Sequence, residues 1–544
     1  MKLNHLLALL VFLIVSCKPS SDSKNTETFS HAEDKLFFSI DDHTKDKSKD
    51  PKFSNSFSLH DDRFLSIHFR LDQPLVHSLK SMEPNLNTEQ LLDKGNFQFS
   101  FLVDGEIIYV ENLDKGAGLV NSKTEQLQHH IPLVSPKQLD FWGWFMWLKF
   151  MKLGGGQDAL SEGVHTLDIE VRPYLQGEAL KTGPVLAKGS ITITVPPITI
   201  DESLVPLQAI QANSGWSLSR DSFNTAKIEA LNRKIAEKRF EHINSIIVIK
   251  EGKLLIEEYF NGETREHLHD PRSVGKSFAS SLLGIAIKDQ YIKNEQALLK
   301  DFYDLKTFKN YSPKKDSVTL KSFLTMSSGF LGDDNNYNSP GNEENMYPTS
   351  DWVKFALDLP MREDTEIGKD FAYFTAGVVV LGAIIDQSVP EGLVAYADKK
   401  LFRPLNITNY EWEYTPQNVG NTAGGIRLRA LDFAKYGQLY KNKGLWNNHQ
   451  ILDKQWVEKS LGKNIAQPID EGHYGYLFWN KTFHIGNTDY EVSYCSGRGG
   501  NKIFIFKDIP YVVTIMSSAY NLPNAHQNVD KMMTDYILPA LINE

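Results

Sequence analysis

The stretch Arg272-Ser-Val-Gly-Lys-Ser-Phe278 decides the fold and carries the first sign of chemistry. A strand and a loop are predicted before it, and apolar residues follow it at the spacing of a buried helix. Three residues are nearly one helical turn, so Ser273 and Lys276 are predicted to share a face. A serine becomes a nucleophile when a base takes its proton, and a lysine kept neutral by burial is such a base. The alternative is a capping serine beside an unrelated lysine.

The same Ser-x-x-Lys spacing occurs at three other serines, Ser21, Ser312 and Ser460. Ser21 lies in a polar tether, Ser312 in a loop, and Ser460 at the end of a helical pattern. None of them combines a preceding strand with a following apolar helix, so Ser273 is the candidate that the pattern favours.

The segments around Ser273 predict an α+β domain. Two strands joined by Glu251-Gly252 form an antiparallel hairpin before it, and three strands are predicted near the end of the chain. Helical patterns and loops fill residues 283–440. We therefore expect one antiparallel sheet flanked by helices, beside a helical subdomain. The predicted strands span 245–250, 253–260, 490–496, 502–507 and 511–517, and the flanking helices 223–240 and 529–542.

Further segments follow Ser273 in a fixed order. They are Leu324-Thr-Met-Ser-Ser-Gly-Phe330, Glu366-Ile-Gly-Lys-Asp-Phe-Ala-Tyr373, Ala423-Gly-Gly-Ile-Arg-Leu-Arg429 with Asp432-Phe-Ala-Lys-Tyr-Gly-Gln438, and Gly497-Arg-Gly-Gly500. With Ser273 and Lys276 they resemble the serine β-lactamase and penicillin-binding-protein superfamily, closest to its class C-like esterases and nylon-oligomer hydrolases. The resemblance covers the chain from about Ile210 onward.

This resemblance implies a role for several residues. Ser273 matches the acylated nucleophile, Lys276 the adjacent base, and Tyr373 the tyrosine of a Tyr-x-Asn motif that passes protons to the leaving group. The family's third motif corresponds to Gly497-Arg-Gly499, which adds Arg498 and Gly499 as substrate-binding candidates. The resemblance also implies that the N–H of Gly500 joins that of Ser273 as an oxyanion hole.

Two residues depart from the family's pattern. Thr375, a further substrate-binding candidate, stands where the motif has asparagine, so an amide that both donates and accepts is replaced by a hydroxyl. Gly497 stands where the third motif has a cationic or imidazole side chain. Both changes favour a small ester or amide as substrate over penicillins or D-Ala-D-Ala peptides.

The alternatives that stay open are a D-Ala-D-Ala peptidase, penicillin-binding protein or β-lactamase, and a non-catalytic binding protein on the same fold. We expect no metal and no cofactor. His267-Leu-His269-Asp270 hints at zinc but lacks the further ligands of a catalytic zinc site, and Lys181-Thr-Gly183 spells the third motif before the nucleophile.

A β-rich region precedes this domain and shows no catalytic pattern. Residues 65–71, 97–103, 107–110, 167–171 and 191–195 alternate with period two, and Asp104-Gly105 is a hairpin turn. A β-sandwich-like domain is therefore predicted over 56–200, and the hydrolase domain over 201–544. Pro196-Pro197 marks the break. The aromatic run 141–151 is too short to span a membrane; we interpret it as a buried clasp between domains, a segment in the membrane interface, or a cover over a cleft.

The first residues predict a lipoprotein. Residues 1–16 resemble a signal peptide, and Ile14-Val-Ser-Cys17 resembles a bacterial lipobox whose cysteine is acylated. An ordinary secretory signal is the alternative. Residues 17–55 are predicted to be a flexible tether. We expect lipid anchoring to a membrane of the bacterial cell envelope, at the outer membrane or facing the periplasm.

Composition excludes other classes of protein. The chain has 544 residues with a net charge of −10, which argues against a nucleic-acid partner, since binding phosphates needs a basic surface. It has two cysteines, too few for a disulfide scaffold or a cysteine-rich zinc module.

Overall fold

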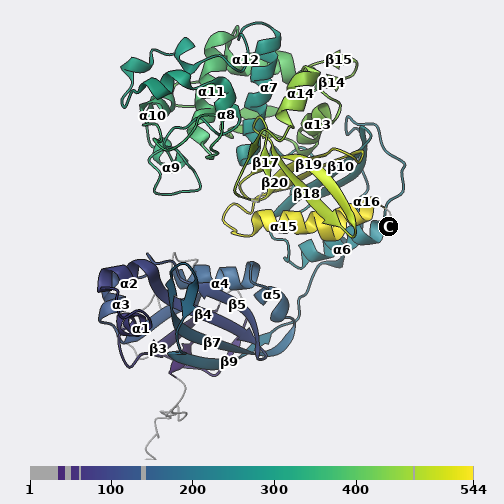
Figure 1. Cartoon of the computed structure of the whole chain (residues 1–544). Helices are drawn as coiled ribbons and strands as arrows, with labels where there is room; N and C mark the ends of the chain where they lie inside the picture. The colour runs from purple at the N-terminus through teal and green to yellow at the C-terminus, as the bar shows by residue number, and fades with distance from the viewer. Residues whose placement is uncertain (1–34, 43–50, 60–62, 136–141, 470–471, 543–544) are drawn as a thin grey trace, which may run out of the picture. The chain divides into compact units, whose positions relative to one another are not determined.

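The computed structural model describes residues 35–42, 51–59, 63–135, 142–469 and 472–542. The predicted signal peptide, Cys17 and Ser21 lie outside the described residues. The chain divides into two compact units between Pro196 and Pro197 (Figure 1). Each unit has its own apolar core and is described by itself.

The first unit consists of two sheets that enclose one core. The smaller sheet has the order β1-β3-β6, and the larger has the order β2-β9-β7-β4-β5, with β8 paired to β7. Their alternating apolar faces give the sandwich-like arrangement that the period-two pattern predicts. The strands are β1 (Leu36–Ser39), β2 (Ser56–Ser58), β3 (Leu65–Arg70), β4 (Gly95–Val103), β5 (Glu106–Asn112), β6 (Gln128–Val134), β7 (Gly163–Gln176), β8 (Leu180–Thr182) and β9 (Ala187–Val195).

The aromatic run of this unit forms helix α4 (Trp142–Lys152). Its Met146, Trp147 and Phe150 side chains are buried in the unit's own core, and Phe150 stacks on Phe101 of β4 at 4.7 Å between ring centroids. Burial in the core accounts for these three side chains, whereas Phe145 of the same helix is 45% exposed. The other helices are α1 (Leu75–Met82), α2 (Thr88–Lys94), α3 (Val120–Thr124) and α5 (Gly156–Ala159).

The second unit is built on an eight-stranded antiparallel sheet with the order β11-β10-β21-β20-β19-β18-β17-β16. The predicted hairpin and three C-terminal strands are present, but the prediction missed the three strands at one edge, β16, β17 and β18. Two of these have only two residues, too few for a periodic pattern. The strands are β10 (Ile243–Lys250), β11 (Lys253–Tyr259), β16 (Ile465–Ala466), β17 (His473–Tyr474), β18 (Trp479–Ile485), β19 (Thr488–Gly497), β20 (Asn501–Phe506) and β21 (Tyr511–Ser517).

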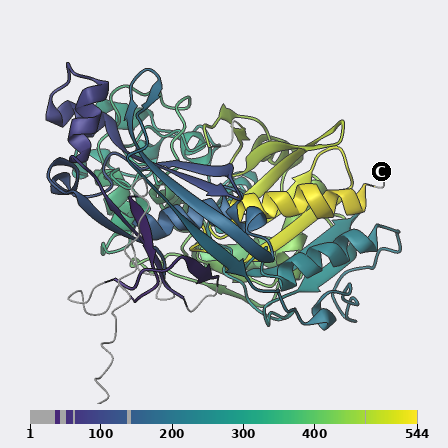
Figure 2. The same ribbon diagram turned by 90° about the horizontal axis from the view of Figure 1, so that it is seen from below.

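Helices cover both faces of this sheet. Helix α6 (Thr225–Ala236) and the C-terminal helices α15 (Ala525–Met532) and α16 (Leu538–Leu541) lie along one face (Figure 1), and the yellow C-terminal segment follows the strands in Figure 2. A π-helical turn (Met533–Ile537) separates α15 from α16, where the sequence predicted one continuous helix over 529–542. On the other face α13 (Ala430–Lys441) packs against β10, β20 and β21.

The helical subdomain surrounds α7 (Gly275–Lys288), the helix predicted after Ser273. All residues of α7 from Gly275 to Ala286 are buried, and Phe278 stacks on Tyr436 of α13 at 3.9 Å. This burial fixes the position of the helix start that carries Ser273. The remaining elements here are α8 (Leu320–Leu324), α9 (Glu343–Met346), α10 (Trp352–Asp358), α11 (Thr375–Ser388), α12 (Gly392–Ala397), α14 (Lys454–Ser460) and the short pairs β12 (Tyr410–Trp412) with β13 (Ile426–Leu428) and β14 (Leu445–Trp446) with β15 (His449–Gln450).

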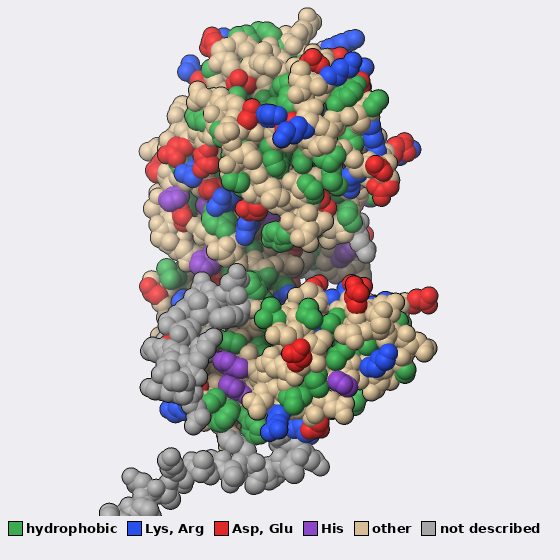
Figure 3. Space-filling model, turned by 90° about the vertical axis from the view of Figure 1, so that its left-hand side faces the viewer, with side chains coloured by type: hydrophobic (Ala, Val, Ile, Leu, Met, Phe, Trp, Pro, Cys, Tyr) green, Lys and Arg blue, Asp and Glu red, His purple; other side chains and the backbone are tan. Residues whose placement is uncertain are grey.

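The surface mixes charges of both signs. On the face shown in Figure 3, acidic and basic side chains are interspersed, in keeping with the acidic composition. Within the described ranges no single helix is long and apolar enough to cross a membrane; α11 together with residues Gly392–Phe402 meets the criterion only as a pair bent by 80°.

Candidate active site

Ser273 and Lys276 face one another at the start of α7. Ser273 lies in a single 3₁₀ turn (Arg272–Val274) that leads directly into the helix. The Lys276 Nζ is 2.7 Å from the Ser273 Oγ, and Lys276 is only 2% exposed while Ser273 remains partly exposed. The predicted shared face is therefore a direct hydrogen bond between a reachable hydroxyl and a buried amine.

A second bond fixes the lysine side chain. Lys276 Nζ also donates to the backbone carbonyl of Ala423 at 2.7 Å. The segment that carries Ala423 comes so close to the start of α7 that glycine is needed on both sides. A Cβ on Gly275 would lie 2.9 Å from the Gly424 Cα, and one on Gly424 would lie 2.8 Å from the Arg272 carbonyl oxygen. The Ala423-Gly-Gly segment thus brings a carbonyl to the lysine, a contact that the sequence did not reveal.

Tyr373 completes the group. It precedes α11, its hydroxyl is within hydrogen-bonding reach of Ser273, and the Lys276 Nζ lies 5.4 Å from its ring centroid. Burial raises the pKa of Tyr373, although the Lys276 charge and the bond with Ser273 oppose the rise. Tyr373 therefore keeps its proton at neutral pH, as a proton donor must.

The segment that carries Tyr373 is held from two sides. The backbone N–H of Ala372 donates to the carbonyl of Met326, in the Met-Ser-Ser-Gly motif. The Tyr373 ring stacks on Trp479 of β18 at 5.7 Å between centroids. Trp479 belongs to one of the strands that the sequence analysis missed, so its place beside the site was also missed.

The residue before the nucleophile has an unusual backbone. Arg272 has a φ of 53°, a left-handed conformation that is unfavourable for a long side chain. Its N–H donates to Asp270 Oδ1 at 3.0 Å, and its guanidinium carbon lies 4.5 Å from the Tyr520 ring centroid. These contacts stabilise the turn that presents Ser273.

Gly497 ends β19 beside this turn. A Cβ at this position would lie 2.0 Å from the Pro271 carbonyl oxygen and 3.1 Å from the backbone nitrogen of Ser273. This backbone therefore leaves no room at position 497 for the lysine or histidine that the third motif would have supplied.

The other substrate-binding candidates occupy different surroundings. Arg498 is exposed and its Nε donates to the Tyr520 carbonyl at 2.9 Å. Gly499 and Gly500 are in the turn after β19, next to Tyr520 and Ala525 respectively. Thr375 is fully buried as the first residue of α11. The roles of these four residues in binding substrate stay predictions.

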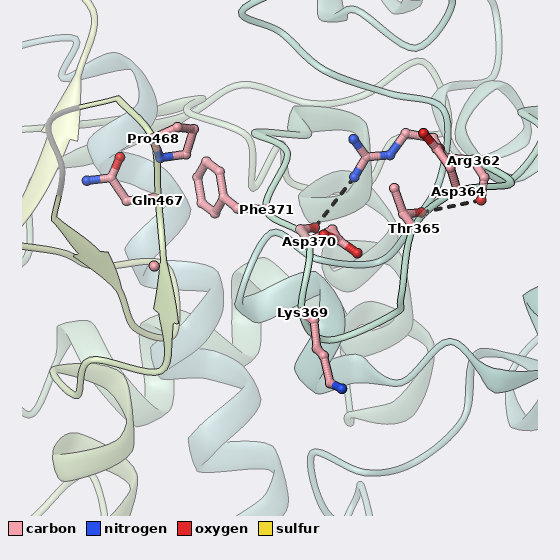
Figure 4. A pocket seen from close by; sticks show the side chains of 9 residues that line it. Arg362, Asp364, Thr365, Lys369, Asp370, Phe371, Gln467 and Pro468 are labelled. Atoms are coloured by element: carbon pink, nitrogen blue, oxygen red, sulfur yellow. Dashed lines mark hydrogen bonds between the residues drawn. The ribbon is translucent and has the colours of Figure 1, made fainter.

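A hollow of about 540 Å³ lies close to Tyr373 along the chain (Figure 4). In Figure 4 the Phe371 ring faces Gln467 and Pro468 across it, and Arg362 donates to the Asp370 carbonyl. Phe371 also contacts Trp479, at 6.1 Å between centroids, so an aromatic layer connects the hollow with Tyr373. The lining residues are Arg362, Asp364, Thr365, Lys369, Asp370, Phe371, Ala466, Gln467 and Pro468.

The histidines before Ser273 have structural partners. His269 is buried, and its Nε2 donates to Asn501 Oδ1 at 2.9 Å, while His267 pairs with Glu263. No group of three potential metal ligands occurs in the part of the chain that the structure describes.

Comparison with known proteins identifies the second unit. The family model named Beta-lactamase matches residues 236–531, which is more than half of the chain. No curated protein matches.

Solved structures match more remotely. One is a penicillin-binding protein homologue from Pyrococcus abyssi, with 20% identity, 59% of this chain and 77% of that chain covered, and a TM-score of 0.46. Another is a D-amino acid amidase from Ochrobactrum anthropi SV3, with 16% identity, 54% and 96% covered, and a TM-score of 0.42. A Bacillus anthracis protein described as a 6-aminohexanoate-dimer hydrolase has 18% identity, 63% and 89% covered, and a TM-score of 0.48.

Proposed function

We propose that this chain, which belongs to the beta-lactamase family, is a serine hydrolase that forms a covalent acyl-enzyme on small esters or amides. One observation carries the proposal: the Ser273 Oγ is 2.7 Å from the Nζ of a lysine that is 2% exposed. A surface Ser-Lys contact would be solvated and would activate nothing, whereas a buried amine can hold the serine proton.

Acylation begins when the Ser273 Oγ attacks the substrate carbonyl carbon. Lys276 acts as base in its unprotonated form: its Nζ takes the serine proton as the Oγ–C bond forms, and negative charge develops on the carbonyl oxygen. The N–H groups of Val274 and Gly275 donate within the turn, so the backbone N–H of Ser273, together with that of Gly500, is assigned to stabilise this oxyanion.

The leaving group then needs a proton. Tyr373 is protonated at neutral pH, because burial raises its pKa, and it lies against both Ser273 and Lys276. It donates its proton to the departing alkoxide or amine as the ester or amide bond breaks, and Lys276 returns a proton to the phenol. In deacylation a water attacks the acyl carbon, gives its proton to the same pair, and Ser273 regains its proton.

The substrate preference follows from Thr375 and Gly497, the two residues that depart from the family's pattern. Thr375 is buried, and position 497 has no room for a side chain, so the groups that hold a β-lactam's amide and carboxylate in the family are missing. We infer a preference for esters or simple amides over β-lactams.

The test is turnover by the purified chain of short-chain esters, small amides and a chromogenic cephalosporin, with Ser273→Ala as control. Ester or amide turnover that exceeds cephalosporin turnover and disappears in Ser273→Ala supports the proposal. Cephalosporin turnover equal to that of the best ester would favour a β-lactamase, and no turnover at all would favour the non-catalytic alternative.

We also propose that Cys17 is lipid-anchored in the bacterial cell envelope, on the strength of the lipobox-like Ile14-Val-Ser-Cys17. Cys17→Ala should move the protein out of the membrane fraction of fractionated cells. Unchanged membrane association of that variant would refute the anchor.

A further inference from the structure

Asp334 joins three segments next to the candidate active site. Its Oδ2 accepts from the Thr375 N–H at 2.7 Å, and its Oδ1 accepts from the Glu343 N–H at 2.8 Å. Its own N–H donates to the carbonyl of Tyr373 at 2.8 Å. One residue thus bonds the backbone on both sides of Phe374, and so holds the segment that ends in Tyr373.

These bonds are more than an ordinary helix cap. The residue that precedes α11, Phe374, has no side-chain oxygen and makes no cap of its own. A serine or aspartate at that position would cap α11 alone. Asp334 instead caps α11 from a loop 41 residues away and bonds Tyr373 as well, so the cap and the tyrosine move together.

The carboxylate is also part of the charge distribution around Tyr373. Burial raises the pKa of Asp334 to about 6, its bonds with Thr375 oppose the rise, and Glu343 adds to it while Lys276 lowers it. Asp334 and Glu343 are the acidic groups that raise the pKa of Tyr373, against Lys276. Above about pH 6 Asp334 is ionised and both its oxygens are charged acceptors, whereas protonation removes the charge and turns one oxygen into an O–H donor.

We propose that Asp334 is a positioning residue of this active site: its two carboxylate bonds and its backbone bond hold Tyr373 in register with Ser273 and Lys276. The proposal rests on the proposed function, because it assigns Asp334 its effect through the proton transfer by Tyr373. A misplacement of about 1 Å in such a group can cost on the order of 100-fold in rate.

The experiment compares Asp334→Asn with its neighbour Asp333→Asn as the matched control. Asp333 is also an aspartate of this loop, but its Oδ1 accepts only locally, from Asn335. In Asp334→Asn we expect kcat to fall on the order of 10- to 100-fold with KM nearly unchanged, because Tyr373 acts in the chemical step. Asp334→Glu, which restores the charge, should recover part of kcat, and Asp333→Asn should stay within about 2-fold of wild type.

Two further readouts separate positioning from general damage. The wild-type kcat should decline below about pH 6 as Asp334 is protonated, and Asp334→Asn should lack that part of the acid limb. Hydrogen exchange, measured by mass spectrometry at one pH, should rise in Asp334→Asn for peptides containing Thr375 and Glu343, and for no others.

The outcomes distinguish this proposal from the proposed function. If the wild-type chain hydrolyses nothing, the proposed hydrolase function is refuted. Hydrogen exchange at Thr375 would still test whether Asp334 holds the start of α11. Unchanged exchange at Thr375, unchanged kcat in Asp334→Asn, or an equal loss in Asp333→Asn would overturn the role of Asp334.

Discussion

Two Ser-x-x-Lys segments of the same unit each have a buried lysine, but the two lysines differ in what they contact. At the start of α7, Lys276 Nζ bonds the Ser273 hydroxyl and one carbonyl. In the 3₁₀ turn Pro313–Ser317, Lys315 is 0% exposed, yet its Nζ bonds two carbonyls, those of Lys309 and Leu357. The Ser312 hydroxyl has no hydrogen-bond partner among the described residues.

The comparison shows that neither spacing nor burial makes a site. Both lysines satisfy the pattern and both are buried, but only one is directed at its serine. The third Ser-x-x-Lys segment, Ser460 to Lys463, resembles the site even less. Its lysine forms an ion pair with Glu491 at the surface and does not bond Ser460. Both serines lie at a 3₁₀ turn, but the turn of Ser273 packs against Gly424 and Gly497 of distant segments, and its hydroxyl bonds the lysine.

Ser273→Ala is the variant with the largest expected effect. Loss of the nucleophile should lower kcat by about 10⁴-fold or more, and Lys276→Ala should be comparably severe. The double variant should be barely worse than either, because removing one member already disables the unit. Measured kcat values for the three variants check this; a double variant much worse than both would show that the residues act independently.

Tyr373→Phe should come next, with kcat lowered by about 10²- to 10⁴-fold and KM nearly unchanged. The ring and its stacking on Trp479 remain, so only the proton donor is lost. Steady-state kinetics with an ester whose leaving group needs protonation would show the full loss, and one with an acidic leaving group a smaller loss. Equal losses for both esters would contradict proton donation by Tyr373.

Lys315→Met should affect stability and leave kcat within about 2-fold of wild type. Burial lowers the pKa of Lys315 to about 8 from 10.5, so between these values the unfolded chain binds the extra proton. The wild type should therefore gain stability relative to Lys315→Met as the pH rises from about 8 to 10.5. Thermal unfolding across this range tests it, and a flat difference would mean that Lys315 titrates normally.

The smallest effect is expected for Ser312→Ala, which should leave both activity and stability near wild type. Its hydroxyl accepts and donates no bond among the described residues, so its loss removes no interaction. A large loss of ester hydrolysis in this variant, with Ser273 intact, would show that Ser312 also contributes to catalysis and would contradict the distinction between the two segments.

Much of this arrangement could be predicted from side chains. Ser273, Lys276 and Tyr373 carry their chemistry in the residue type, and the hairpin and the central strands have clear apolar patterns. The Ala423 carbonyl could not be predicted, because a backbone group has no signature in sequence and its approach depends on glycines far apart in the chain. Asp334 was missed because its carboxylate accepts from backbone N–H groups at the starts of α9 and α11, and a bond to a backbone group leaves no pattern in the sequence.

The central claim is that Ser273 is the residue activated by Lys276. Its most direct test is to react the purified chain with a fluorophosphonate and to locate the adduct by peptide mass spectrometry. We predict a single modified residue, Ser273, with no label in Ser273→Ala and full label in Ser312→Ala. An adduct on Ser312 or Ser460, or label that persists in Ser273→Ala, would contradict it.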